Sequence, residues 1–250
     1  MIGALLVVVP LALALLGPLF VSDVGRGAPF MPNSMLGTDF VGRDVWQQVL
    51  LGGQTVVLVA LLATVLSYAI GVPWGVVAAM SRVVDDVLMR PLDLLLAVPS
   101  LLVLILAAAI AGPGLPVLIG IVTLVNFPDV ARISRGAALE IAARPALEAM
   151  RLQGETWWRT SVLYTGRAML RTLAADAGVR LTGALYLVAS ASFLGVGVPP
   201  DAADWAVMVD RNRVGLFLQP WAVVVPALLI VALSVGLNLT FDRALRKEAV

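Results

Sequence analysis

The residue types that perform most enzyme chemistry are missing from this sequence. Its 250 residues include no cysteine and no histidine, which excludes a thiol nucleophile, a disulfide, a thiolate metal site and the usual neutral-pH proton carrier. The single lysine, Lys247, follows no glycine-rich loop, and the phosphate-binding pattern G-x-x-x-x-G-K-[ST] does not occur. We therefore expect no catalytic residue, no metal site and no bound cofactor in this chain.

Polar side chains that interrupt apolar runs are the remaining candidates for chemistry. Asp176 and Arg180 are four residues apart, the spacing that brings two side chains together on one face of a helix. A lone charge inside a bilayer is costly, so pairing is the economical explanation, and lining a translocation path is the alternative. Asn126, near the end of another apolar run, could line the same path or bond to a neighbouring helix.

One charged segment, RPALEAMRLQGETWW at residues 144–158, stands between long apolar runs. As a helix it would be amphipathic, with alternating charges on the polar stripe that could pair along the surface. The apolar stripe would contain Leu147, Met150, Gly154 and Trp157, and the charged stripe Arg144, Glu148, Arg151, Glu155 and Arg159. The glycine indicates either a break between two short helices or a close approach by another backbone. The segment is either a solvated loop on the lipid headgroups or a docking helix for a cytoplasmic partner.

The composition indicates the environment that must hold these residues. Hydrophobic residues make up 60% of the chain and charged residues only 13%, about half the charged fraction of a soluble domain. The chain is therefore predicted to be an all-α membrane protein that crosses the bilayer several times. Its formal net charge of +1 gives no reason to expect nucleic acid.

Six stretches are long and apolar enough to cross a membrane, which takes about 20 residues each. Within the second, Gly71 and Gly75 form a small-xxx-small step suited to close helix contact. The turn sequence GPGLP at 112–116 separates the third from the fourth. We expect one membrane domain over residues 1–250, with spans at about 1–20, 49–80, 92–111, 115–131, 173–194 and 221–241.

The distribution of basic residues predicts the orientation. Loops on one side, including the long loop 132–171, hold 12 of the 17 basic residues, and loops on the other side hold four. Basic loops stay in the cytoplasm, so both termini and the long loop are expected there. Two opposite loops hold candidate contacts for an extracytoplasmic partner, namely Thr38, Asp39, Arg43, Asp201 and Asp204. In the alternative, Thr38 and Asp39 start the helix that leads into the second span, and the loop with Asp201 and Asp204 only caps the bundle.

The segment EAMRLQG, Glu148 to Gly154, resembles the E-A-A-x-x-x-G signature in the membrane subunits of ATP-binding-cassette importers, with Met150 in place of the second alanine. The likeness extends along most of the chain to the dipeptide, oligopeptide and nickel permease branch, and above all to its C-type subunit. The similar segments are LGTDFVGRDV at 36–45, DDVLMRPLDLLLAVPSLL at 85–102, FPDVARISRG at 127–136, ASFLGVGVPPDAADWAVMV at 191–209 and PWAVVVPALLIVALSVGLNLTFDRALR at 220–246.

This resemblance implies the type I importer permease fold in a bacterial or archaeal cytoplasmic (inner) membrane. It implies a second, B-type permease, two ATPase domains that bind ATP and magnesium, and an extracytoplasmic substrate-binding protein as partners. The segment would be the coupling helix that docks on an ATPase, through Leu147, Glu148, Ala149, Met150, Arg151, Gly154 and Trp157. The implied cargo is short peptides, with nickel chelates or other metallophores as the alternative.

A gradient-driven secondary transporter is the rival interpretation from another class. Such proteins place ionisable residues or broken helices near the middle of the membrane. Here the centres of the predicted spans are nearly free of charge, which counts against coupling to an ion gradient. A membrane scaffold or intramembrane enzyme is a third interpretation, and the absence of histidine and cysteine counts against the enzyme.

Overall fold

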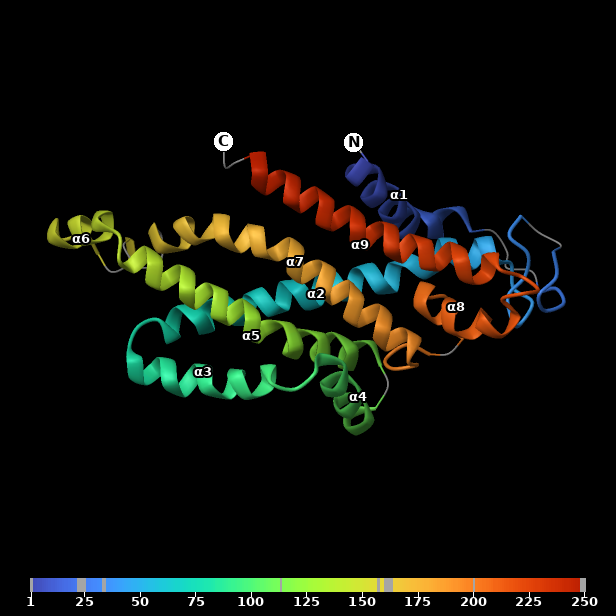
Figure 1. The fold of residues 1–250 in the computed structure, drawn as a ribbon, viewed down its shortest axis with the longest axis horizontal. Helices are drawn as coiled ribbons and strands as arrows, with labels where there is room; N and C mark the ends of the chain where they lie inside the picture. Colours follow the sequence, from blue (N-terminus) through green and yellow to red (C-terminus); the bar gives the residue numbers. More distant parts are fainter. Residues whose placement is uncertain are drawn as a thin grey trace.

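The computed structural model is helical wherever it forms regular structure, with two isolated β-bridges in the loops (Figure 1). It describes residues 2–21, 26–32, 35–112, 114–156, 158–159, 164–199 and 201–247. The α-helices are α1 (Ile2–Leu16), α2 (Val45–Ala78), α3 (Arg82–Leu96), α4 (Ser100–Ala111), α5 (Leu115–Ala142), α6 (Pro145–Leu152), α7 (Thr165–Phe193), α8 (Trp205–Asn212) and α9 (Trp221–Lys247). Two short 3₁₀ helices, Gly17–Phe20 and Arg213–Gly215, follow α1 and α8.

Helices α2 and α5 form the centre of the bundle, and two glycines allow them to approach closely. A Cβ atom at Gly75 would lie 2.2 Å from the carbonyl oxygen of Ala131, and one at Gly71 would lie 2.9 Å from Cβ of Val130. No larger residue fits such contacts without moving the backbone. The small-xxx-small step in the sequence therefore marks a true helix contact, and it fixes α5 against α2.

The first and last helices pack side by side in opposite directions. A Cβ atom at Gly3, at the start of α1, would lie 3.1 Å from Cβ of Leu239, near the end of α9, and Gly236 packs in the same way on Leu6. Both ends of the described chain therefore lie on the same side of the bundle (Figure 1). Helix α6 forms one end of the molecule, whereas α8 and the loop that precedes α2 form the other.

Four of the described helices are long and apolar enough to cross a membrane: α1 with its 3₁₀ extension, α2, α5 and α9. Helices α3 and α4 together make a fifth if the pair counts as one span. The sequence also predicts a span at 173–194. Helix α7 covers most of that stretch and has 29 residues, but Asp176 and Arg180 make it more polar than the other spans.

The third predicted span, 92–111, is wrong as a single straight helix. The chain bends by 92° between α3 and α4, where Pro99 precedes the first turn of α4. Proline disfavours the helical conformation in the residue before it and lacks an N–H donor, so a break at this point is expected physically. The apolar run continues across the break, which hides it from hydropathy.

The cytoplasmic loop predicted at 132–171 is largely helical. Helix α5 continues to Ala142, eleven residues beyond the predicted end of its span, and α7 begins at Thr165. The consecutive small residues Ala137 and Ala138 are buried in this extension. The long helices thus carry the chain well beyond the apolar core to the short helix α6.

Candidate functional site

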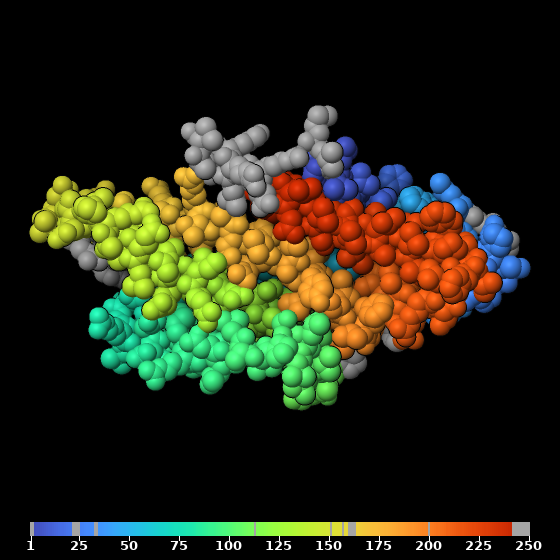
Figure 2. Space-filling view, viewed as in Figure 1, coloured from blue at the N-terminus to red at the C-terminus, as the bar shows by residue number. Residues whose placement is uncertain are grey.

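Helix α6 forms the tip of one end of the molecule, between α5 and α7 in the chain (Figure 2). Glu148 and Ala149 are exposed on it, Met150 is half-buried, and Leu147 is buried with 2% exposure. Arg151 belongs to the helix, but its side chain lies outside the description, and Trp157 lies outside the described residues altogether. The exposed side of α6 is therefore available at the Glu148 and Ala149 positions.

Gly154 ends α6. Its φ of +75° lies in the left-handed region, and the amide of Glu155 donates to the carbonyl of Met150 over 3.1 Å. This is the Schellman arrangement, in which glycine is favoured because a side chain costs energy at that φ. Of the two alternatives for this glycine, a break in the helix is confirmed, since α6 ends at Leu152. Apart from its two chain neighbours, no described residue has an atom within 4 Å of the position that a Cβ would take at Gly154, so the turn explains the glycine and a close approach by another described segment does not.

The predicted pairing along the charged stripe is confirmed for Glu155 and Arg159, whereas Arg144 pairs outside the stripe and the Arg151 side chain lies outside the description. Arg144 reaches back to Glu140 over 2.8 Å, and Arg159 pairs with Glu155 over 2.8 Å. In the portion of the chain that the structure describes, no ion pair holds Glu148. The exposed Glu148 carboxylate is thus open to solvent or to a partner.

A small apolar cluster anchors the helices that flank α6. Ala137, Ala138 and Ile141 of α5 pack with Met169 of α7, and side chains of α2 cover them. Met169 is 1% exposed and Ile141 is 2% exposed. The cluster therefore holds the end of α5 and the start of α7, the two helices that α6 joins, against α2.

Gly154→Val is expected to lower transport activity several-fold without preventing membrane insertion. A β-branched residue at φ +75° costs about 1–2 kcal/mol, so the turn would shift and α6 would tilt. Gly154→Asn is the matched control, because asparagine tolerates the left-handed region. We expect the asparagine variant to retain most activity when initial uptake rates are compared at equal membrane content. Equal activity of the valine variant would show that the turn is incidental.

Four polar side chains form an ion cluster between α2, α5 and α7. Arg180 donates to Asp176 over 3.1 Å and to Asp129 over 2.6 Å, and the Tyr68 hydroxyl donates to Asp176 over 2.6 Å. The predicted pair of Asp176 and Arg180 is confirmed. Its partners Asp129 and Tyr68 were not predicted, since Asp129 lies 51 residues from Arg180 and Tyr68 lies 108 residues from Asp176.

Two further ion pairs join α3 to the C-terminal half of α5. Arg135 forms a bidentate ion pair with Asp85, and Arg132 pairs with Asp93. These pairs were not predicted from the sequence, although Asp85 and Asp93 are spaced for the same face of a helix. They hold the first half of the broken span against the helix that leads to α6.

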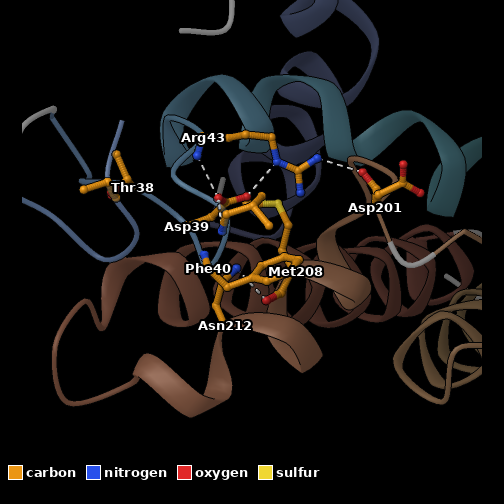
Figure 3. Close-up of polar contacts among 9 residues, drawn as sticks. Thr38, Asp39, Phe40, Arg43, Asp201, Met208 and Asn212 are labelled. Carbon is orange, nitrogen blue, oxygen red and sulfur yellow. Dashed lines mark hydrogen bonds and ion pairs between the residues drawn. The ribbon is translucent and has the colours of Figure 1, made fainter. Parts of the chain in front are cut away.

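On the opposite end, Asp39 organises the loop before α2 rather than starting that helix. Its carboxylate accepts from the amides of Val41 and Arg43 and from Nε of Arg43, all within 2.9 Å (Figure 3). The residue that caps α2 is Asp44, which accepts from the amide of Gln47. The N-cap role predicted for Thr38 and Asp39 is therefore wrong by several residues.

The same loop also bonds to the segment before α8 and to α8 itself (Figure 3). Nη1 of Arg43 donates to the carbonyl of Asp201 over 2.8 Å, and the amide of Phe40 donates to Oδ1 of Asn212 over 2.9 Å. The Thr38 hydroxyl points away from this contact and donates to the carbonyl of Ala28. Thr38 is 6% exposed and Asp39 is 2% exposed; both are used inside the chain, whereas Asp201 is exposed.

Asp204 caps α8 and is fully buried. Its Oδ1 accepts from the amides of Ala206 and Val207 over 2.9 and 3.1 Å. Burial raises the pKa of this carboxyl from 3.8 to about 6, and those two amides and the nearby Ser192 hydroxyl oppose the rise. Neither Oδ2 of Asp204 nor the Ser192 hydroxyl meets hydrogen-bond geometry with any described residue.

Asp204 is expected to make the protein less stable as pH rises from about 4 to about 6. The folded state holds the proton more tightly than the unfolded state in that window, so the ionised form is the costly one above it. Asp204→Asn keeps the Oδ1 acceptor and removes the charge. We expect its melting temperature to exceed that of the wild type by more at about pH 7.5 than at about pH 5. The same difference at both pH values would contradict the assignment.

Comparison with known proteins decides the family. Residues 71–247 match the model of the family described as binding-protein-dependent transport system inner membrane component. The chain belongs to this family. The match includes α6 and its glycine turn, the broken span, and Asp129, Asp176 and Arg180 of the ion cluster, whereas Tyr68 precedes it. The family is a membrane-spanning transport component, so the chain is the permease subunit of an ATP-binding-cassette importer rather than a catalytic subunit.

Named relatives of the family agree with this. A probable peptide ABC transporter permease of Sinorhizobium fredii is 29% identical over 92% of this chain and 81% of its own length. A putative peptide permease of Brucella abortus is 32% identical over 82% of this chain and 69% of its own length. A putative peptide transport system permease of Brucella suis is 33% identical over 83% and 70%.

The fold is also that of a solved permease. An inward-facing structure of the MetNI methionine ABC transporter superposes with a TM-score of 0.62, covering 78% of this chain and 94% of that chain. The sequence identity is 17%, so this likeness speaks for the fold alone. The predicted type I importer permease fold is confirmed.

Proposed function

We propose that this chain forms half of the translocation pathway of an ATP-driven importer of short peptides, with α6 as the helix that docks on an ATPase. The observation that carries the proposal is the geometry of α6. It ends the molecule on one side, it presents Glu148 and Ala149 outward, and it joins the ends of α5 and α7.

The mechanism follows from how α6 is mounted. Closure of the ATPases on ATP would push α6, with Glu148 as the charged anchor and Leu147 as the buried support. The apolar cluster around Met169 and Ile141 would pass the movement to α5 and α7. These helices meet the broken span and the ion cluster deeper in the bundle, so their tilt changes which side of the path is open.

The assembly that this mechanism requires has several subunits in a bacterial or archaeal cytoplasmic membrane. A second permease completes the path, two ATPase domains supply energy, and an extracytoplasmic binding protein delivers cargo. Exposed Asp201 remains a candidate contact for that protein, and Arg43 positions its backbone. Peptides are the proposed cargo because the named relatives are described as peptide permeases.

Uptake by the whole transporter in sealed liposomes tests the proposal. With the binding protein outside and ATP inside, labelled dipeptide should accumulate, and it should not when ATP is replaced by a non-hydrolysable analogue. A proton or sodium gradient alone should give no uptake. Accumulation driven by the gradient without ATP would overturn the proposal in favour of a secondary transporter.

A further inference from the structure

The break between α3 and α4 opens a cavity of about 450 Å³ in the bundle. Its walls are the chain at 95–100, Asn126 and Asp129 of α5, and Gly183 and Tyr186 of α7. This volume falls within the range of about 300–1,000 Å³ that is typical of small-ligand sites. A larger cavity of about 710 Å³ between α7, α8 and α9 is lined almost entirely by apolar side chains.

Asn126 lines the smaller cavity, and its side chain carries a buried hydrogen-bond donor that is unused. The residue is 6% exposed, and Nδ2 has no hydrogen-bond partner among the described residues. A buried amide without a partner is costly, so a partner that arrives transiently would be bound favourably. A peptide carbonyl oxygen has the required chemistry, and a lipid acyl chain has not.

The charge beside the cavity is negative. Asp129 and Asp176 share the single guanidinium of Arg180, so the three groups hold a formal charge of one negative unit. Asp176 is nearly buried, whereas the Asp129 side chain is 34% exposed and lines the cavity, which Arg180 does not. A carboxylate in that position attracts a cation that enters the cavity.

We propose that this cavity binds the amino-terminal end of a short peptide during translocation. The ammonium group would bind the Asp129 carboxylate, and the Asn126 amide would turn into the cavity so that Nδ2 donates to the first peptide carbonyl. The inference rests on the proposed peptide-import function and adds a binding site to the translocation path. It also assigns the broken span a purpose, because the bend at Pro99 creates the space that the peptide enters.

The native absence of cysteine permits a direct test. Ser100→Cys places a thiol on the cavity wall, and Ser190→Cys places one in the apolar cavity as a matched control. The purified whole transporter is treated with a small maleimide, with and without alanyl-alanine or its N-acetyl derivative. Labelling of this chain is followed on gels.

Alanyl-alanine should slow labelling of the Ser100→Cys variant by about threefold or more. It should leave the labelling rate of the Ser190→Cys variant unchanged. The N-acetyl derivative, which has no ammonium group, should protect the thiol at position 100 much less. Adding Asn126→Leu to Ser100→Cys should raise the dipeptide concentration for half-protection by about three- to tenfold. Asn126→Ser, which keeps a donor on a shorter side chain, should give a smaller rise; it also serves where the leucine variant does not assemble.

Absence of protection, equal protection of the Ser190→Cys variant, or equal protection by the acetylated peptide would overturn the inference. The inference would also fail if maleimide labelled the thiol at position 100 in the isolated chain but not in the whole transporter, because a partner subunit would then fill the cavity. ATP-driven uptake of alanyl-alanine by the same preparation separates the two claims. Uptake without protection defeats the cavity assignment alone, and absence of uptake defeats the proposed function.

Discussion

Arg180→Met is expected to destabilise the folded chain by about 3–5 kcal/mol. The guanidinium is the shared counter-charge of Asp129 and Asp176, and its side chain is 19% exposed. Methionine is of similar length but leaves two carboxylates between α5 and α7 with no positive partner. The measurement is thermal unfolding of the detergent-purified protein followed by tryptophan fluorescence, with yield of folded protein as a second readout.

The matched control removes the charges together. A triple variant with Arg180→Met, Asp129→Asn and Asp176→Asn buries no net charge, and replacing a buried ion group by neutral residues is often tolerated. We expect it to recover most of the lost stability. A methionine variant as stable as the wild type, or a triple variant less stable than the single one, would contradict the role assigned to the cluster.

Glu148→Lys is expected to lower ATP-driven transport by about tenfold or more. The side chain is exposed on α6, so the variant should insert and fold normally, whereas inversion of the docking charge should weaken the hold of the ATPase. Initial uptake rates and the amount of ATPase that co-purifies are the two measurements. Loss of both together would locate the defect at docking.

Asp86→Lys is the control for this variant, since it inverts another exposed carboxylate that lies on α3 rather than on α6. The Asp86 side chain is 63% exposed and is paired with Arg90 on α3. It should leave transport within about twofold of the wild type, as expected for a surface pair. If both variants lost activity equally, general surface charge rather than docking at α6 would be responsible.

Local patterns in the sequence predicted the features that depend on near neighbours. The apolar runs indicated the membrane class, Gly71 and Gly75 indicated a close helix contact, and the spacing of Asp176 and Arg180 indicated their pair. Each of these rests on helix periodicity or on composition, which operate over a few residues. The family resemblance supplied the remainder of the fold.

Features that depend on tertiary packing were not predictable in this way. Asp129 joins Arg180 from another helix, and no spacing rule reaches across 51 residues. Proline alone does not mark the broken span, because Pro91 lies inside α3 whereas Pro99 stands at the bend. Asp39 was predicted to be a helix cap, but the helix begins later, at Val45. The Asp39 carboxylate instead accepts from backbone amides of its own loop.

Whether α6 docks on an ATPase is decided most directly by mass spectrometry of the proteins that co-purify with this chain from its native membrane in mild detergent. We expect a second permease and ABC ATPase domains, with the ATPases lost from the Glu148→Lys variant. Recovery of the chain alone, or only with copies of itself, would contradict the docking role. Helix α6 would then be an amphipathic surface feature rather than a docking helix.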